Sequence, residues 1–147
     1  MKNLKEPTQP DLTDSLPLCI GLNDASKSIF EDNKRKGFWD SPRETGTLLM
    51  LCVSELAEAL EADRKDKFVE PRNMRCFESD HNEKWERPSH DAFSFEANIK
   101  DRFEDEIADT IIRLLDLCGA RGIDIEKHIN YKLEFNRRRA RMHGKAY

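Results

Sequence analysis

Two pairs of acidic residues, each set within an otherwise apolar helical segment, constrain this chain more than any other feature. Glu55 and Glu58 lie in segment 47–62, and Glu106 and Asp109 lie in segment 103–118. Both segments carry an apolar stripe at helical spacing, formed by Leu49, Val53, Leu56 and Leu60 in the first and by Phe103, Ile107, Ile111, Leu114 and Cys118 in the second. Because the acids flank these stripes on a helical projection, we expect their carboxylates at the edge of the buried side.

The four carboxylates converge if the two segments pack as neighbouring helices. Unpaired buried charges cost too much free energy to persist, so such a cluster requires cations or protons. No Cys or His interrupts either pair, which favours a hard divalent cation with oxygen ligands, Mg²⁺ first and Mn²⁺ as the alternative. The spacing is equally compatible with ordinary solvated acids, since acidic residues three apart are common on helices.

Composition excludes several classes of protein. A length of 147 residues suits one domain, and 37% hydrophobic residues suffice for a helical core. The net charge of −4 disfavours a general nucleic-acid binder. The sequence has no signal-peptide core and no run of eighteen apolar residues, so we expect a cytoplasmic protein with no membrane partner. Cys52 and Cys118 lie in apolar helical segments, as reduced thiols do.

The periodicity predicts an all-α fold, a four-helix bundle or part of a larger one. Residues 1–17 contain three of the six prolines and are expected to form an irregular arm, with the helical domain covering 18–147. The expected helices are 18–36, closed by Gly37; 41–66, with Ser41 as N-cap and Pro42 following; 96–118, ending near Gly119 and Gly122; and 124–142, capped by Asp124. Segment 67–95 breaks helical periodicity and contains Pro71 and Pro88, so it is predicted to be a long irregular insertion between the second and third helices.

A third set of polar residues lies in the last expected helix. Lys132, Asn136 and Arg139 fall within about 60° of one another on a helical projection. Two cations and an amide at the edge of the buried side suit a polyphosphate, because Arg offers a planar fork and Lys a point charge. They can instead pair with the acidic residues or form a basic helix end that complements the helix dipole.

The motifs together resemble a known family. Ser54-Glu55-Leu56-Ala57-Glu58-Ala59 and Glu106-Ile107-Ala108-Asp109 resemble the E-x-x-E and E-x-x-D motifs of MazG-like members of the all-α NTP pyrophosphohydrolase superfamily. Lys36-Gly37-Phe38-Trp39-Asp40 is similar to the loop after their first helix. Lys132, Asn136 and Arg139 with His143-Gly144-Lys145 are similar to their C-terminal pattern. The resemblance covers about 20–147 without the insertion.

This resemblance implies hydrolysis of a nucleoside triphosphate to the monophosphate and pyrophosphate, by a homodimer or homotetramer. It implies that Mg²⁺ is held by four catalytic carboxylates, those of Glu55, Glu58, Glu106 and Asp109. Lys132, Asn136 and Arg139 would then stabilise the leaving pyrophosphate. Phe38 and Trp39 would stack on the base or, equally, plug the end of the bundle. The two acidic pairs lie further apart in sequence than is usual in the family, which leaves substrate specificity open.

Three other functions compete with this interpretation. The first is a catalytically silent helical oligomer that binds nucleotide or a protein partner as a regulator. A basic-tail RNA binder based on 137–141 ranks lower, because no aromatic residues are interleaved with the arginines. A di-iron bundle needs two Glu-x-x-His motifs on core helices, and the single one, Glu78 to His81, lies in the insertion.

Overall fold

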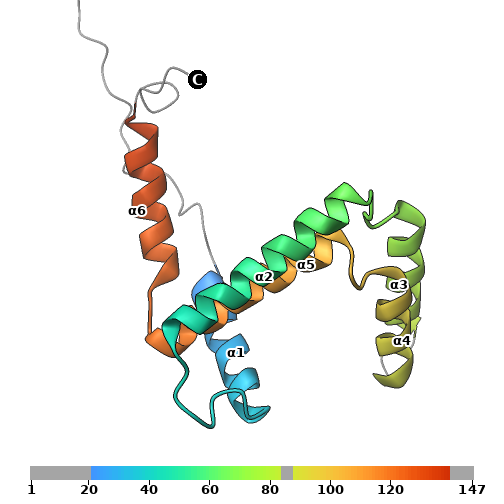
Figure 1. Cartoon of the computed structure of the whole chain (residues 1–147), viewed down its shortest axis with the longest axis horizontal. Helices are drawn as coiled ribbons and strands as arrows, with labels where there is room; N and C mark the ends of the chain where they lie inside the picture. The colour runs from blue at the N-terminus through green and yellow to red at the C-terminus, as the bar shows by residue number, and fades with distance from the viewer. Residues whose placement is uncertain (1–20, 84–87, 140–147) are drawn as a thin grey trace, which may run out of the picture. The chain divides into compact units, whose positions relative to one another are not determined.

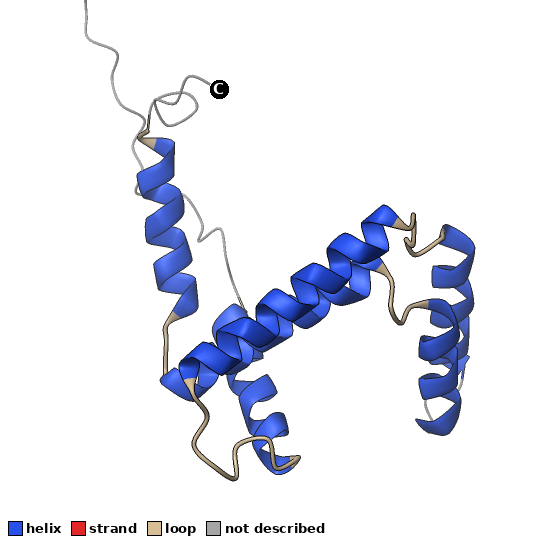
Figure 2. Cartoon of the chain, viewed as in Figure 1, coloured by secondary structure: helices blue, strands red, loops and turns tan. Residues whose placement is uncertain are grey.

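The computed structural model describes residues 21–83 and 88–139, and these residues form helices and loops without a strand (Figure 2). The predicted all-α class is confirmed. The helices are α1 (Leu22–Arg35), α2 (Thr45–Arg64), α3 (Pro71–Glu83), α4 (Pro88–Asn98), α5 (Phe103–Arg121) and α6 (Ile125–Arg137). Within the described ranges, none of them combines the length and apolar character needed to cross a bilayer.

The chain divides into two units. Asp24–Ile123 forms one unit and contains α2 to α5 with nearly all of α1, while the described residues 21–23 and 124–139 belong to the other. In this second unit the Asp124 side chain accepts the Lys127 N–H at 3.1 Å, which confirms the predicted cap of α6. The predicted arm 1–17 and the residues after 139, with the expected helix end at 142, lie outside the described residues.

The larger unit is built on α2 and α5, which pack side by side in antiparallel directions (Figure 1). The α2 residues buried there are Leu48, Cys52, Glu55, Ala59 and Ala62. The predicted stripe of α2 is instead 45–50% exposed, so this expectation was wrong. Two rows of α2 share the same helical spacing, and the row with the smaller side chains allows the closer approach to α5. On α5, Ile111 and Leu114 of the predicted stripe are likewise exposed.

Helix α1 crosses α5 at a glycine. A Cβ on Gly119 would lie 2.6 Å from the Ser26 carbonyl oxygen and 2.7 Å from the Phe30 Cβ, so only glycine fits there. The buried Ser26 hydroxyl also donates to the Leu115 carbonyl at 2.7 Å. Gly37 follows the end of α1 with a φ of 85°, as predicted. The helix begins at Leu22, directly after Gly21 with its φ of 86°, and the predicted start at 18 lies outside the described residues.

The loop between α1 and α2 is longer than predicted. Helix α2 begins at Thr45, with Glu44 and not Ser41 at the N-cap position. The preceding residues fold around Trp39, whose indole N–H donates to Asp116 and whose ring lies 5.6 Å from the Arg43 guanidinium. Ser41 and its neighbours therefore belong to the loop that connects Trp39 to the start of α2.

The prediction of an irregular insertion at 67–95 was wrong, because this segment forms α3 and most of α4. Each of these helices begins at a proline, Pro71 or Pro88, which the sequence suggested as a breaker. Proline is favoured in the first turn, where its missing N–H has no intrahelical partner in any case. The predicted third helix 96–118 is also divided, since α4 ends at Asn98 and Asp101 adopts a φ of 58° before α5 begins.

Helices α3 and α4 pack on each other and are tied to α5. The rings of Phe77 and Phe95 meet edge to face at 5.8 Å, and the Ser94 hydroxyl donates to Asp80 at 2.8 Å. At the start of α5, the Phe103 N–H donates to the Lys67 carbonyl at 3.0 Å. These contacts bring the helical hairpin to the same end of α5 as the acidic pair of that helix.

Candidate metal centre

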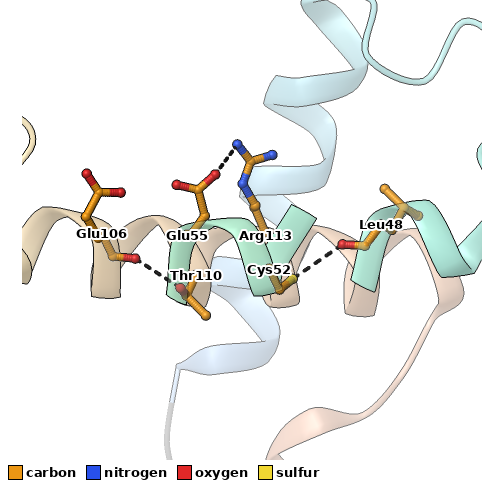
Figure 3. Close-up of polar contacts among 6 residues, drawn as sticks. All are labelled: Leu48, Cys52, Glu55, Glu106, Thr110 and Arg113. Carbon is orange, nitrogen blue, oxygen red and sulfur yellow. Dashed lines mark hydrogen bonds and ion pairs between the residues drawn. The ribbon is translucent and has the colours of Figure 1, made fainter. Parts of the chain in front are cut away.

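Three of the four predicted carboxylates meet between α2 and α5. One oxygen each of Glu55, Glu58 and Glu106 lies within 4.8 Å of the others. Glu55 and Glu106 project from neighbouring helices to the same side of the pair (Figure 3). Their residues are only 6% and 5% exposed, whereas Glu58 is exposed to solvent. We call these three residues the acid site.

The acid site holds more negative charge than its surroundings can stabilise. The pKa of Glu106 rises from 4.5 to about 7, first because of burial and then because of the charges of Glu58 and Glu55. Near neutral pH this carboxyl therefore binds a proton in a large fraction of molecules. A divalent cation among the three carboxylates would take over the role of that proton.

Asp109, the fourth predicted ligand, adjoins this group without belonging to it. It is half-buried and lies one turn beyond Glu106 on α5. Burial raises its pKa, and the charges of Asp105 and Glu55 raise it further. The carboxylate of Asp109 is thus part of the same electrostatic environment and extends the acid site along α5.

Arg113 is a component of the site that sequence reasoning missed. One of its terminal nitrogens lies 2.6 Å from Glu55 Oε1 (Figure 3). Its Nε is buried and has no hydrogen-bond partner within the described part of the chain. The sequence did contain a signal, because Arg113 follows Glu106 by two helical turns and so lies on the same side of α5. Its guanidinium offsets one of the carboxylate charges.

Neutral groups form the layer beside the acid site. The Thr110 hydroxyl donates to the Glu106 carbonyl at 3.0 Å, and the Cys52 thiol donates to the Leu48 carbonyl at 3.5 Å. Cys52 and Cys118 are buried free thiols, as predicted, and burial raises the pKa of both. Protonated thiols are poor metal ligands, so the donors available to a cation here are carboxylate oxygens.

Trp39 has the contacts of a packing residue. Its indole N–H donates to the buried Asp116 at 3.1 Å, and its ring meets Phe30 edge to face at 5.4 Å. Arg43 lies over the ring, and Trp39 and Arg43 together line a cavity of about 420 Å³. The two predicted roles of Trp39 are stacking on the base and plugging the end of the bundle. These contacts within the fold favour the second role. Phe38 is 56% exposed, and its role in base stacking stays a prediction.

The predicted phosphate-binding residues lie together on and just after α6. Lys132 Nζ and the Arg139 guanidinium carbon lie 5.3 Å and 5.8 Å from the centre of the Phe135 ring. The side-chain oxygen of Asn136 is buried and has no hydrogen-bond partner among the described residues. These residues belong to the smaller unit, so their action at the acid site stays a prediction.

The chain matches no family model, no curated protein and no solved structure. The resemblance to MazG-like proteins therefore rests on the motifs themselves.

Proposed function

We propose that this protein is a Mg²⁺-dependent nucleoside triphosphate pyrophosphohydrolase, which converts an NTP or dNTP to the monophosphate and pyrophosphate. The observation that carries this proposal is the meeting of three carboxylates from two helices within 4.8 Å, two of them buried. Buried carboxylates that lack enough cationic partners destabilise a fold, so their presence calls for a ligand. The motif resemblance supplies the chemical class of that ligand, a cation-bound triphosphate.

The donor set fits Mg²⁺. All of the donors are carboxylate oxygens, and Mg²⁺ binds oxygen in an octahedral arrangement at about 2.0–2.1 Å. Neighbouring ligands of such an ion lie about 3 Å apart, so a modest closure of side chains within 4.8 Å of one another would suffice. Glu55, Glu58 and Glu106 would hold the ion, with Asp109 beside them. Mn²⁺ has the same ligand preference and is the alternative.

The reaction needs an attacking water, charge stabilisation and a leaving group. A bound Mg²⁺ supplies polarisation of the phosphate oxygens and neutralises the charge that develops on them. Water attacks the α-phosphorus, the bond from this phosphorus to the α,β-bridging oxygen breaks, and pyrophosphate leaves with that oxygen. A carboxylate of the acid site or Asp109 accepts the water proton. Lys132, Asn136 and Arg139 stabilise the leaving pyrophosphate.

We further propose that the active form is a homodimer or a homotetramer. The support is the apolar row of α2, which the larger unit by itself leaves about half exposed: Leu49, Val53, Leu56 and Leu60. A contiguous row of four exposed large apolar side chains on one helix is typical of a protein–protein interface. Two copies that cover this row would form a four-helix bundle from two α2–α5 pairs, which differs from the bundle of four helices of one chain that the sequence predicts.

Sedimentation velocity tests the oligomer. Leu56→Glu places a charge in the exposed apolar row and should shift the protein towards the monomer. Ser54→Glu adds the same charge at another exposed position of α2 and should leave the oligomer unchanged. A wild-type protein that sediments as a monomer would contradict this part of the proposal.

One observation favours the alternative, a catalytically silent oligomer that binds nucleotide or a protein as a regulator. Arg113 already pairs with Glu55 at 2.6 Å, so part of the charge at the acid site is compensated within the chain. Pyrophosphate release from a panel of NTPs and dNTPs, with Mg²⁺ and with EDTA, distinguishes the two. Release that requires Mg²⁺ and is lost in Glu58→Gln supports the enzyme, and nucleotide binding without release supports the regulator.

A further inference from the structure

A cavity of about 540 Å³ lies where the α3–α4 hairpin meets α5. The residues that line it include two aromatic residues, three acidic residues and one lysine: Phe77, Phe95, Glu96, Asp105, Asp109 and Lys100. This volume is within the range of about 300–1,000 Å³ that small-molecule sites have. The cavity shares Asp109 with the surroundings of the acid site, so a molecule bound in it would extend towards Glu106.

We propose that this cavity binds the base of the nucleoside triphosphate and selects bases that carry an exocyclic amino group, guanine above all. The proposal rests on the proposed function, because it concerns the substrate of the same acid site. This proposal gives the α3–α4 hairpin a role, whereas the proposed hydrolysis otherwise involves no residue of α3 or α4.

The charges of the cavity determine which end of the nucleotide enters it. Three acidic residues and one lysine line the cavity, so its net negative charge repels the triphosphate and leaves the uncharged base as the part that fits. Along α5, Asp109 and Glu106 are about 4.5 Å apart at the usual helical rise. One sugar can bridge a separation of that order, which is how base and α-phosphate are joined in a nucleotide.

The aromatic residues provide an apolar wall. Phe77 and Phe95 meet at 5.8 Å with an interplanar angle of 74°, so each ring fixes the orientation of the other. Phenylalanine rings bind bases through stacking and apolar contact, and these contacts are tolerant of base identity. Affinity for a base thus comes from the aromatic rings, and the choice among bases comes from the polar groups.

The polar groups favour hydrogen-bond donors on the base. An ionised carboxylate only accepts hydrogen bonds, and its two oxygens can accept from two adjacent N–H groups. Guanine presents a ring N–H next to an amino group, and adenine and cytosine present an amino group. Uracil and thymine present two carbonyl oxygens around a single N–H, and these oxygens would face carboxylates. Glu96 is the exposed member of this set that lies on the hairpin itself.

Titration calorimetry with non-hydrolysable α,β-imido analogues of GTP and UTP, in the presence of Mg²⁺, tests the proposal. We expect the wild type to bind the GTP analogue about 10-fold to 100-fold more tightly, the range for one charge-assisted hydrogen bond. Glu96→Gln should reduce this ratio to about 3-fold or less. Glu78→Gln, an exposed change of the same charge on α3 at a residue that does not line the cavity, should preserve it.

A second variant tests the aromatic wall. Phe95→Leu keeps an apolar side chain between α3 and α4, and it should weaken binding of both analogues by a similar factor without changing their ratio. Mg²⁺ binding in the absence of nucleotide should be the same in all variants. Equal affinity of the wild type for both analogues, or an unchanged ratio in Glu96→Gln, would overturn the proposal.

The outcomes also separate this inference from the proposed function. Selective binding without pyrophosphate release would leave the cavity assigned and the enzyme refuted. Mg²⁺-dependent pyrophosphate release, together with base selectivity that does not depend on Glu96, would support the enzyme and refute the role of the cavity.

Discussion

Replacement of Glu106 by glutamine should stabilise the metal-free protein at alkaline pH. The pKa of this carboxyl rises from 4.5 to about 7 on folding, which corresponds to about 3 kcal/mol of unfolding free energy. Below pH 4.5 the carboxyl is protonated in the folded and the unfolded chain, so it costs nothing. Between pH 4.5 and 7 only the folded chain keeps the proton, and the free energy of unfolding falls as the pH rises. Glutamine cannot ionise and avoids this loss.

The measurement is urea denaturation followed by circular dichroism, in EDTA, at pH 4.5 and at pH 8. Glu106→Gln and wild type should have similar free energies of unfolding at the lower pH. At pH 8 the variant should be more stable by up to about 3 kcal/mol. Glu31→Gln removes the same charge from an exposed position of α1 and should change stability by less than about 0.5 kcal/mol at either pH.

Mg²⁺ should reverse the order of stability at pH 8. A ligand that binds only the folded state stabilises it by about 4.1 kcal/mol when present at 1,000 times its Kd, which exceeds the lead of about 3 kcal/mol that the variant has in EDTA. Wild type should gain this stabilisation, whereas Glu106→Gln has lost a ligand and should gain little. An effect of Glu106→Gln that is the same at both pH values, or a variant less stable than wild type at pH 8 in EDTA, would refute the reasoning about the acid site.

Three further predictions concern other residues of the proposed function. Glu58→Gln or Asp109→Asn should abolish pyrophosphate release and leave the circular dichroism spectrum unchanged, and wild-type turnover in either variant would contradict the assignment of that residue. Lys132→Ala and Arg139→Ala should each weaken substrate binding or turnover by about 1.5–3 kcal/mol; Arg138→Ala is the control, and an equal loss there would indicate general electrostatics. Arg113→Met should lower metal-free stability by about 1–3 kcal/mol, because Glu55 loses its partner. The same variant should bind Mg²⁺ more tightly in calorimetry, and weaker binding would mean that Arg113 does not compete with the cation.

Local signals in the sequence predicted much of this structure. Asp124 caps α6, Gly37 follows α1, and Gly122 ends α5 in the left-handed conformation, because each of these roles depends on the residue and its immediate neighbours. The meeting of Glu55 with Glu106 was also predictable, since helical spacing fixes which side chains share a face. It required only the assumption that the two acidic helices are neighbours.

Other features depend on choices that local patterns do not determine. Pro71 and Pro88 interrupt a helix in mid-course but favour its first turn, and the sequence alone does not separate the two cases. Arg113 is a single cation on a helix rich in charges, and its importance appears only when its distance to Glu55 is known. The buried row of α2 was mistaken because hydrophobicity favoured the leucines, whereas the structure buries the row of smaller residues.

That choice of row also explains why an acid site exists. The distance between packed helices depends on the side chains at the contact, with axes about 8–10 Å apart. Cys52 and Ala59 are small and flank Glu55 on α2, so α5 can approach closely enough for Glu106 to reach it. Leucines at this contact would increase the separation and turn Glu55 away from α5. The close approach of the two carboxylates and the exposure of Leu49, Val53, Leu56 and Leu60 therefore have one cause, the orientation of α2 about its own axis.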